Sequence, residues 1–211
     1  MTTAHHLKIA LKNIRPAIAR EILVPSDIRL DRLHDVIQLA MGWEDCHLHE
    51  FSNGVRGLGE LRFGPRGAEM DMGFGPPMRD ESKATLLDLA PAKGDKFTYS
   101  YDFGDDWLHT IMVKAIGELR PADVPLPVCL KAAGACPPED CGGPHGYVRF
   151  LEVLDDPKHP EYNDLRNWIG GDWDSEHYDI VWVNQSLAKL AASWNRSPKK
   201  RAARKTTTKK G

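Results

Sequence analysis

The sequence predicts an α+β fold in which an antiparallel sheet, built from two β-hairpins, is covered by helices and followed by a disordered basic C-terminal tail. Residues 7–24 and 97–113 each contain two runs of alternating apolar and polar residues joined by turn-forming residues. Three further stretches carry apolar residues at helical spacing, whereas the C-terminal residues lose all periodicity. We therefore expect an α+β domain over residues 1–195 and a tail over residues 196–211.

The first hairpin is followed directly by a helix. Apolar side chains alternate over residues 7–11 and 18–24, and the turn-forming residues 13–16 separate the two runs. Apolar residues recur at helical spacing over residues 30–41, and Gly42 suits the left-handed conformation that ends many helices. This order predicts a β-hairpin that is covered by a helix.

The second hairpin carries an acidic turn. Residues 97–101 alternate, residues 102–106 read Asp-Phe-Gly-Asp-Asp, and residues 107–113 alternate on the return. Between the two hairpins, residues 47–52 alternate like a further strand. Residues 53–82 are rich in Gly and Pro and give only weak strand signals.

The C-terminal part combines an irregular loop with two helices. Residues 121–144 hold six of the fifteen prolines and three of the four cysteines, which predicts an irregular but ordered loop. Apolar residues at helical spacing predict helices over residues 147–154 and 183–194.

The charge is unevenly distributed along the chain. The formal net charge is −2, but residues 196–211 contain eight Lys and Arg and no acid, so the remainder carries −10. A flexible basic arm can contact phosphates that such an acidic body repels, although cations at a terminus also promote solubility without binding anything. The tail therefore predicts weak, sequence-independent nucleic-acid contact. The residues expected to make it are Lys199, Lys200, Arg201, Arg204 and Lys205.

Composition excludes several classes of protein. No run of about 18 apolar residues occurs, and residues 1–6 have neither the cationic nor the apolar region of a signal peptide. Four cysteines are too few for a disulfide-stapled mini-protein. We expect a cytoplasmic protein without a membrane span, whose cysteines are reduced or bind a metal.

An acidic cluster surrounds the turn of the second hairpin. Asp102, Asp105 and Asp106 lie close in sequence to His109. Three carboxylates and an imidazole could bind a divalent cation and position water for phosphoester hydrolysis. The alternative interpretation is a tight turn in which Asp side chains bond locally.

Two further groups of residues could bind a ligand. Tyr99, Tyr101 and Trp107 could form an aromatic wall, but aromatic residues in strands are more often core. Glu139 and Asp140 could contact a ligand, although acids after prolines also begin turns.

Histidines and cysteines provide candidate metal ligands. His47 and His49 would point the same way from a strand, as a buried hydrogen-bonded pair or as a ligand pair. Cys129, Cys136 and Cys141 supply three soft ligands within thirteen residues, so zinc is a candidate cofactor and reduced thiols are the alternative. Residues that could complete such a zinc site are Cys46, His49, His109 and His145.

Several strings together resemble a known family. They are the N-terminal hairpin and helix, HLHEF, YSYDFGDDWLH, ACPPEDCGGPHGY and DPKHPEY, spread over residues 5–194. The chain is similar to the plasmid pRiA4b ORF-3-like family. This resemblance implies an α+β fold in bacteria and archaea, frequent location on plasmids or mobile elements, and, for some members, a label as transposon passenger proteins of a TnpR type. It implies no known reaction.

Two functions remain open at this point. The first is a non-enzymatic binding or accessory module associated with mobile DNA, which the resemblance, the basic tail and the missing catalytic motifs favour. The alternative is a metal-dependent phosphoester hydrolase that uses Asp102, Asp105, Asp106 and His109. Carboxylates gathered around a cleft would favour the enzyme, and dispersed carboxylates would favour the module.

Overall fold

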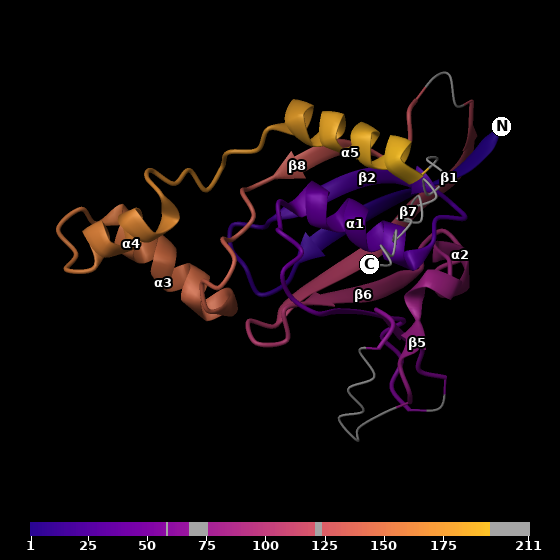
Figure 1. The fold of residues 1–211 in the computed structure, drawn as a ribbon, viewed down its shortest axis with the longest axis horizontal. Coiled ribbons are helices and arrows are strands. Elements are labelled where there is room, and N and C mark those ends of the chain that lie inside the picture. The colour runs from indigo at the N-terminus through magenta and orange to yellow at the C-terminus, as the bar shows by residue number, and fades with distance from the viewer. Residues whose placement is uncertain (58, 68–75, 121–123, 195–211) are drawn as a thin grey trace, which may run out of the picture.

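An eight-stranded, mostly antiparallel sheet forms the base of the fold (Figure 1). The computed structural model describes residues 1–57, 59–67, 76–120 and 124–194, so the predicted basic tail lies outside the described residues. The strand order is β5-β4-β3-β6-β7-β1-β2-β8. The strands are β1 (Thr2–Leu11), β2 (Ala19–Pro25), β3 (His49–Ser52), β4 (Arg62–Gly64), β5 (Arg79–Asp80), β6 (Lys96–Tyr101), β7 (Trp107–Leu119) and β8 (Val128–Ala133).

Both predicted hairpins are present, but they do not make up the sheet. β1 pairs with β2 and β6 pairs with β7, all antiparallel, and β7 joins the two hairpins by pairing with β1. β3 pairs with β6 and extends the sheet through β4 to β5, the last pair being parallel. β8 pairs with β2 and forms the opposite edge. The prediction of a sheet built from two hairpins was therefore too narrow, because four further strands complete it.

Helices cover the sheet and also extend beyond it. They are α1 (Leu30–Met41), α2 (Leu86–Leu89), α3 (Gly143–Asp155), α4 (Tyr162–Ile169) and α5 (Ile180–Trp194), with a short 3-10 helix, η1 (Glu81–Lys83). α1 contacts α5, and α5 contacts β8. Figure 1 shows α3 and α4 as an arm beyond the end of the sheet. No helix of the described residues is long and apolar enough to cross a membrane.

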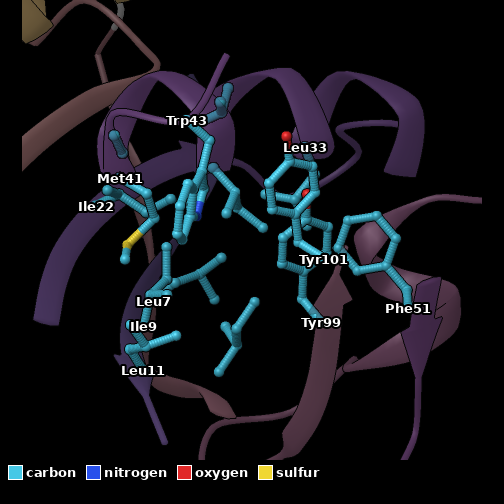
Figure 2. Packing of buried hydrophobic residues seen from close by; sticks show 14 of the residues in the cluster. Leu7, Ile9, Leu11, Ile22, Leu33, Met41, Trp43, Phe51, Tyr99 and Tyr101 are labelled. Atoms are coloured by element: carbon cyan, nitrogen blue, oxygen red, sulfur yellow. The ribbon is translucent and has the colours of Figure 1, made fainter. Parts of the chain in front are cut away.

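The core lies between α1 and the sheet (Figure 2). Leu7 and Ile9 of β1 are fully buried, as are Leu30 and Leu33 of α1, because helical spacing places the apolar side chains of α1 on one face. Gly42 ends the helix with φ 109°, and its N–H donates to the Gln38 carbonyl. The predicted boundaries of this helix are confirmed.

A buried arginine joins distant parts of the chain. Arg20 of β2 is fully buried, and its guanidinium donates to the carbonyl oxygens of Ala40 at 2.7 Å, Met41 at 3.3 Å and Ala133 at 2.9 Å. It also lies over the ring of Tyr178, with its Cζ 4.1 Å from the ring centroid. Carbonyls and an aromatic face, rather than a carboxylate, therefore balance this charge.

Candidate metal centre

Three connections meet at one end of the sheet: the segment between α1 and β3, the β6–β7 turn, and the loop between β8 and α3. The Asp102 N–H donates to the Leu48 carbonyl at 2.9 Å, which joins the first two. The Gly142 N–H donates to Asp105 Oδ2 at 3.1 Å, which joins the second and third. At Gly143, φ is +68° and a Cβ would overlap the Asp105 carbonyl oxygen, so this close approach requires glycine.

Four side chains converge where these connections meet, and we call them the three-loop corner: His47, Asp102, Glu139 and Asp140. His47 Nε2 lies 3.1 Å from Asp140 Oδ1, 3.6 Å from Asp102 Oδ2 and 3.9 Å from Glu139 Oε2. The ligand atoms of His47, Asp102 and Asp140 all lie within 4.8 Å of one another, and so do those of Cys46, His47 and Glu139.

Hydrogen bonds from neighbouring groups orient two of these carboxylates. Asp102 Oδ1 accepts from the Gly104 N–H at 2.9 Å, so that its other oxygen is the one nearer His47. Glu139 Oε1 accepts from the Glu44 N–H at 2.8 Å and from the Tyr101 hydroxyl at 3.0 Å. Burial raises the pKa of Tyr101, which keeps its hydroxyl protonated as a donor. Outer partners of this kind fix the orientation of metal ligands in known sites.

The corner contains buried polar atoms without partners. His47 Nε2 and Glu139 Oε2 are both buried and make no hydrogen bond, although the side chains are 27% and 14% exposed. Buried polar atoms in proteins are nearly always paired, and exceptions commonly mark a functional site or a bound ion. Asp102 and Asp140 also adopt left-handed backbone conformations, with φ of 53° and 54°. Such conformations are uncommon for residues other than glycine and collect at functional sites.

The predicted hydrolase cluster is not assembled. Among the described residues, Asp102 shares a ligand group with His47 and Asp140, not with Asp105, Asp106 or His109. His109 is fully buried on β7, because strand alternation turns it into the core, and its Nδ1 lies 3.1 Å from the Tyr99 carbonyl oxygen. Burial lowers its pKa to about 4, so this imidazole is neutral. Asp106 is exposed in the turn, where its N–H donates to the Asp102 carbonyl.

The predicted aromatic wall is mostly core. Tyr99 and Trp107 are fully buried, and only the hydroxyl of Tyr101 reaches the corner. Glu139 and Asp140, which the sequence identified as possible binding residues, both belong to the corner.

The three-cysteine zinc site is not formed. No group of three candidate ligands within 4.8 Å in the described chain contains Cys129, Cys136 or Cys141. The reason is that β8 carries Cys129 toward α5, where the Tyr178 hydroxyl donates to its Sγ at 3.5 Å. Burial raises the pKa of all three thiols, as expected for reduced structural cysteines.

A second group of histidines and acids lies next to the corner. Four hydrogen bonds close a ring. The Asp45 N–H donates to Gln38 Oε1 at 3.0 Å, and Gln38 Nε2 donates to the Tyr99 oxygen at 2.8 Å. The Tyr99 hydroxyl in turn donates to His34 Nδ1, and His34 Nε2 donates to Asp45 Oδ1, both at 2.8 Å. This assignment makes His34 neutral, in agreement with burial, which together with His49 lowers its pKa. Because both nitrogens of His34 are engaged, they are not free to bind a metal.

The ring stacks on a second buried histidine. The His34 and His49 rings lie 3.5 Å apart between centroids and 8° from parallel, and His49 Nε2 bonds to Glu81 Oε2 at 2.8 Å. No buried side-chain nitrogen or oxygen of these residues lacks a partner. We call this group the closed cluster: His34, Gln38, Asp45, His49, Glu81 and Tyr99.

The fold and the corner together define a mixed α+β protein with an open group of candidate metal ligands among the described residues, His47, Asp102, Glu139 and Asp140. The family model described as "Plasmid pRiA4b ORF-3-like protein" matches residues 3–181, and the chain therefore belongs to this family. The resemblance seen in the sequence is confirmed.

Two relatives agree with this placement. "Uncharacterized protein y4hQ" of Sinorhizobium fredii (strain NBRC 101917 / NGR234) is 39% identical over 201 residues, which is 92% of this chain and 96% of that protein. The crystal structure of "Protein of Unknown Function MM3350" from Methanosarcina mazei Go1 is 36% identical with a TM-score of 0.73, and the match covers 86% of this chain and 97% of that one. Neither name states an activity.

Proposed function

We propose that this protein is a non-enzymatic binding module whose three-loop corner holds one divalent metal ion through His47, Asp102, Glu139 and Asp140. The observation that carries this proposal is a pair of buried atoms that make no hydrogen bond, His47 Nε2 and Glu139 Oε2, which lie 3.9 Å apart, with Asp140 Oδ1 3.1 Å from the same nitrogen. One imidazole with three carboxylates is a ligand set suited to Zn²⁺ or Mn²⁺. The proposed association with plasmids or mobile elements rests on the family name alone.

The spacing of the donor atoms supports a metal rather than an ion pair. Two ligands bonded to one tetrahedral Zn²⁺ at about 2.0 Å lie about 3.3 Å apart. The three distances from His47 Nε2, at 3.1, 3.6 and 3.9 Å, bracket this value. A protonated His47 would donate one Nε2–H and so could satisfy only one of the three carboxylates. A metal ion could engage Asp102 and Asp140 at once, because their ligand atoms and that of His47 all lie within 4.8 Å of one another, and Glu139 Oε2 lies 3.9 Å from the same nitrogen.

Charge supports binding rather than phosphoester hydrolysis. Three carboxylates around one dication leave a formal charge of −1, and the Asp105 carboxylate lies beside the corner, bonded to the Gly142 N–H. An anionic phosphoester would be repelled from this region. The dispersal of Asp105, Asp106 and His109 also supports the module.

Metal titration of the full chain tests this proposal. After chelator treatment, we expect one Zn²⁺ or Mn²⁺ to bind per chain in calorimetry at pH 7, and Asp140→Asn to weaken binding at least about tenfold. Asp140 is 72% exposed, so this change should leave the fold intact. Asp106→Asn is the matched control, because Asp106 is exposed in the adjacent turn, and its affinity should stay within twofold.

Two outcomes would contradict the metal site. The first is the absence of stoichiometric binding by the unaltered protein. The second is an equal loss of affinity in Asp140→Asn and Asp106→Asn, which would mean that general negative charge attracts the ion.

A further inference from the structure

A second pocket, whose lining contains none of the four corner residues, combines aromatic and acidic side chains. It has a volume of about 490 Å³ and lies between the segment before α5, the first turn of α5 and the end of α1. This size is within the range of ligand-binding pockets. Its aromatic and acidic lining consists of Asp172, Trp173, Asp174, Tyr178, Asp179 and Trp182.

The charges that line this pocket have one sign. Among the described residues, three aspartates and no Lys or Arg line it. Two arginines lie next to the lining, because Arg166 is ion-paired with Asp172 and Arg20 lies over the Tyr178 ring. Asp174 and Asp179 each accept a backbone N–H with one carboxylate oxygen, from Glu176 and Trp182 respectively. These bonds hold the carboxylates in place at the rim, where they favour a cationic ligand.

The aromatic residues of the pocket have the chemistry of a cation site. Tyr178 already carries the Arg20 guanidinium over its ring at 4.1 Å. Trp182 is 55% exposed, although burial of so large a side chain is the rule, and the buried Trp173 Nε1 makes no hydrogen bond. Aromatic faces combined with carboxylates recognise guanidinium and ammonium groups.

The chain itself contains a segment with the complementary charge. Residues 143–182, which include α3, α4 and the aromatic and acidic residues of the pocket, carry nine acids and three Lys or Arg, whereas residues 196–211 carry eight Lys or Arg and no acid. The path from Trp194 back to Trp182 spans twelve helical residues, or about 18 Å. Sixteen residues of extended chain can span about 50 Å, so residues 196–211 are long enough to reach the pocket.

We propose that this pocket binds a Lys or Arg side chain of the chain's own basic segment, residues 196–211. The site would then hold the cations that are also expected to contact nucleic acid, so the two contacts would compete. This proposal is independent of the metal site, because it uses none of the four corner residues.

Peptide binding to the full-length chain tests the proposal. The receptor is a tail-neutral variant in which all eight Lys and Arg of residues 196–211 are replaced by Gln, so that the chain cannot fill the pocket with its own cations and is not shortened. The replaced residues are Arg196, Lys199, Lys200, Arg201, Arg204, Lys205, Lys209 and Lys210. The probe is a fluorescent peptide of residues 196–211, titrated at low salt in the presence of EDTA. We expect this probe to bind the tail-neutral receptor about tenfold more tightly than it binds the unaltered protein, and to lose affinity as salt is raised.

Two tryptophans provide the matched pair of variants. In the tail-neutral receptor, Trp182→Ala should weaken peptide binding about tenfold, since it removes the exposed face of the pocket. Trp168→Ala should change affinity less than twofold, because Trp168 is exposed to a similar degree, at 50%, but lines a different pocket between α3 and α4. A thermal melt of each variant verifies that it is folded.

Three results would overturn the proposal. They are equal losses in the two tryptophan variants, equal peptide affinity for the tail-neutral and unaltered proteins, and undiminished binding of a peptide whose Lys and Arg are replaced by Gln. Retained peptide affinity in Trp182→Ala together with stoichiometric metal binding would reject this pocket and leave the proposed function intact.

Discussion

The closed cluster and the three-loop corner are neighbours made of the same residue types, yet they differ in one respect. Each group uses a histidine near the start of β3 and a tyrosine of β6. The closed cluster contains His49 and Tyr99, whereas the corner contains His47 and is contacted by the Tyr101 hydroxyl. In the closed cluster every buried side-chain donor and acceptor has a partner within the protein. In the corner, the buried His47 Nε2 and Glu139 Oε2 make no hydrogen bond, although His47 Nε2 has ion-pair contacts with the carboxylates.

This difference separates a structural group from a candidate binding group. Histidine, tyrosine and carboxylates alone do not indicate a metal site, because the closed cluster contains all three. What distinguishes the corner is that its hydrogen bonds hold the carboxylates in place but leave Glu139 Oε2 and His47 Nε2 available to a ligand. Mutations should therefore affect stability at one group and ligand binding at the other.

The largest effect on stability is expected at Glu81. Glu81→Ala should lower the free energy of unfolding by about 3 kcal/mol, because it leaves the buried His49 without its carboxylate partner. Glu139→Gln should change stability by less than about 1 kcal/mol, because the amide oxygen can still accept from Glu44 and Tyr101. Urea unfolding of both variants at pH 7 in EDTA measures the difference. Comparable losses would show that the corner is a second structural cluster.

Tyr99 and Tyr101 provide a sharper comparison, because replacement by Phe removes the same hydroxyl oxygen at two positions of β6 that are two residues apart. Tyr99→Phe should cost about 2 kcal/mol, since Gln38 Nε2 and His34 Nδ1 both lose their partner, and should leave metal affinity unchanged. Tyr101→Phe should cost about 1 kcal/mol but weaken metal binding 10- to 100-fold, roughly as other outer partners do, since it removes a bond that orients Glu139. Calorimetric titration and urea unfolding of each variant provide the two readouts. An exchange of the two patterns would assign the metal to the closed cluster.

The smallest effect is expected at Asp35, which lies beside His34 and Asp45. Burial, followed by the charge of Asp45, raises the pKa of Asp35 to about 6 from an ordinary value of 3.8. The folded state thus binds the Asp35 proton more tightly than the unfolded state does. Above about pH 6 the carboxylate is charged in both states, and its charge destabilises the fold. Below pH 3.8 it is protonated in both states, and this destabilisation disappears. Asp35→Asn should stabilise the protein by about 1 kcal/mol at pH 7, after allowance for partial exposure.

The pH dependence of that gain is the control. Thermal melts of Asp35→Asn and the unaltered protein should converge as the pH falls from 7 to 4. A gain that stays constant over this range would mean that it does not come from the carboxylate charge.

Local patterns in the sequence were sufficient for part of the fold. The two hairpins and α1 were predicted because their alternation and helical spacing are regular and end at recognisable turn residues. β8 was missed because it lies in a Pro- and Cys-rich stretch and becomes a strand by pairing with β2, about a hundred residues earlier. α4 was missed because it has eight residues and none of them is buried, which leaves little periodic signal.

The corner could be predicted only in pieces. Asp102 was recognised in the turn cluster and Glu139 with Asp140 as a separate pair, and His47 was considered only with His49. They meet because β3 pairs with β6 and the loop after β8 returns beside Asp105, neither of which local sequence reveals. His109 was grouped with the turn carboxylates because it is close to them in sequence, although the alternation of residues 107–113 places it on the buried face of β7.

The buried Arg20 affects how the molecule can open. Its carbonyl partners belong to the last turn of α1 and the end of β8, and Tyr178 precedes α5, so segments more than a hundred residues apart share one cation. If any one of them separated alone, that cation would lose partners while still buried, which is costly. The amide hydrogens of these segments should therefore exchange with deuterium together, as one cooperative unit, rather than in sequence from the edge strand inward.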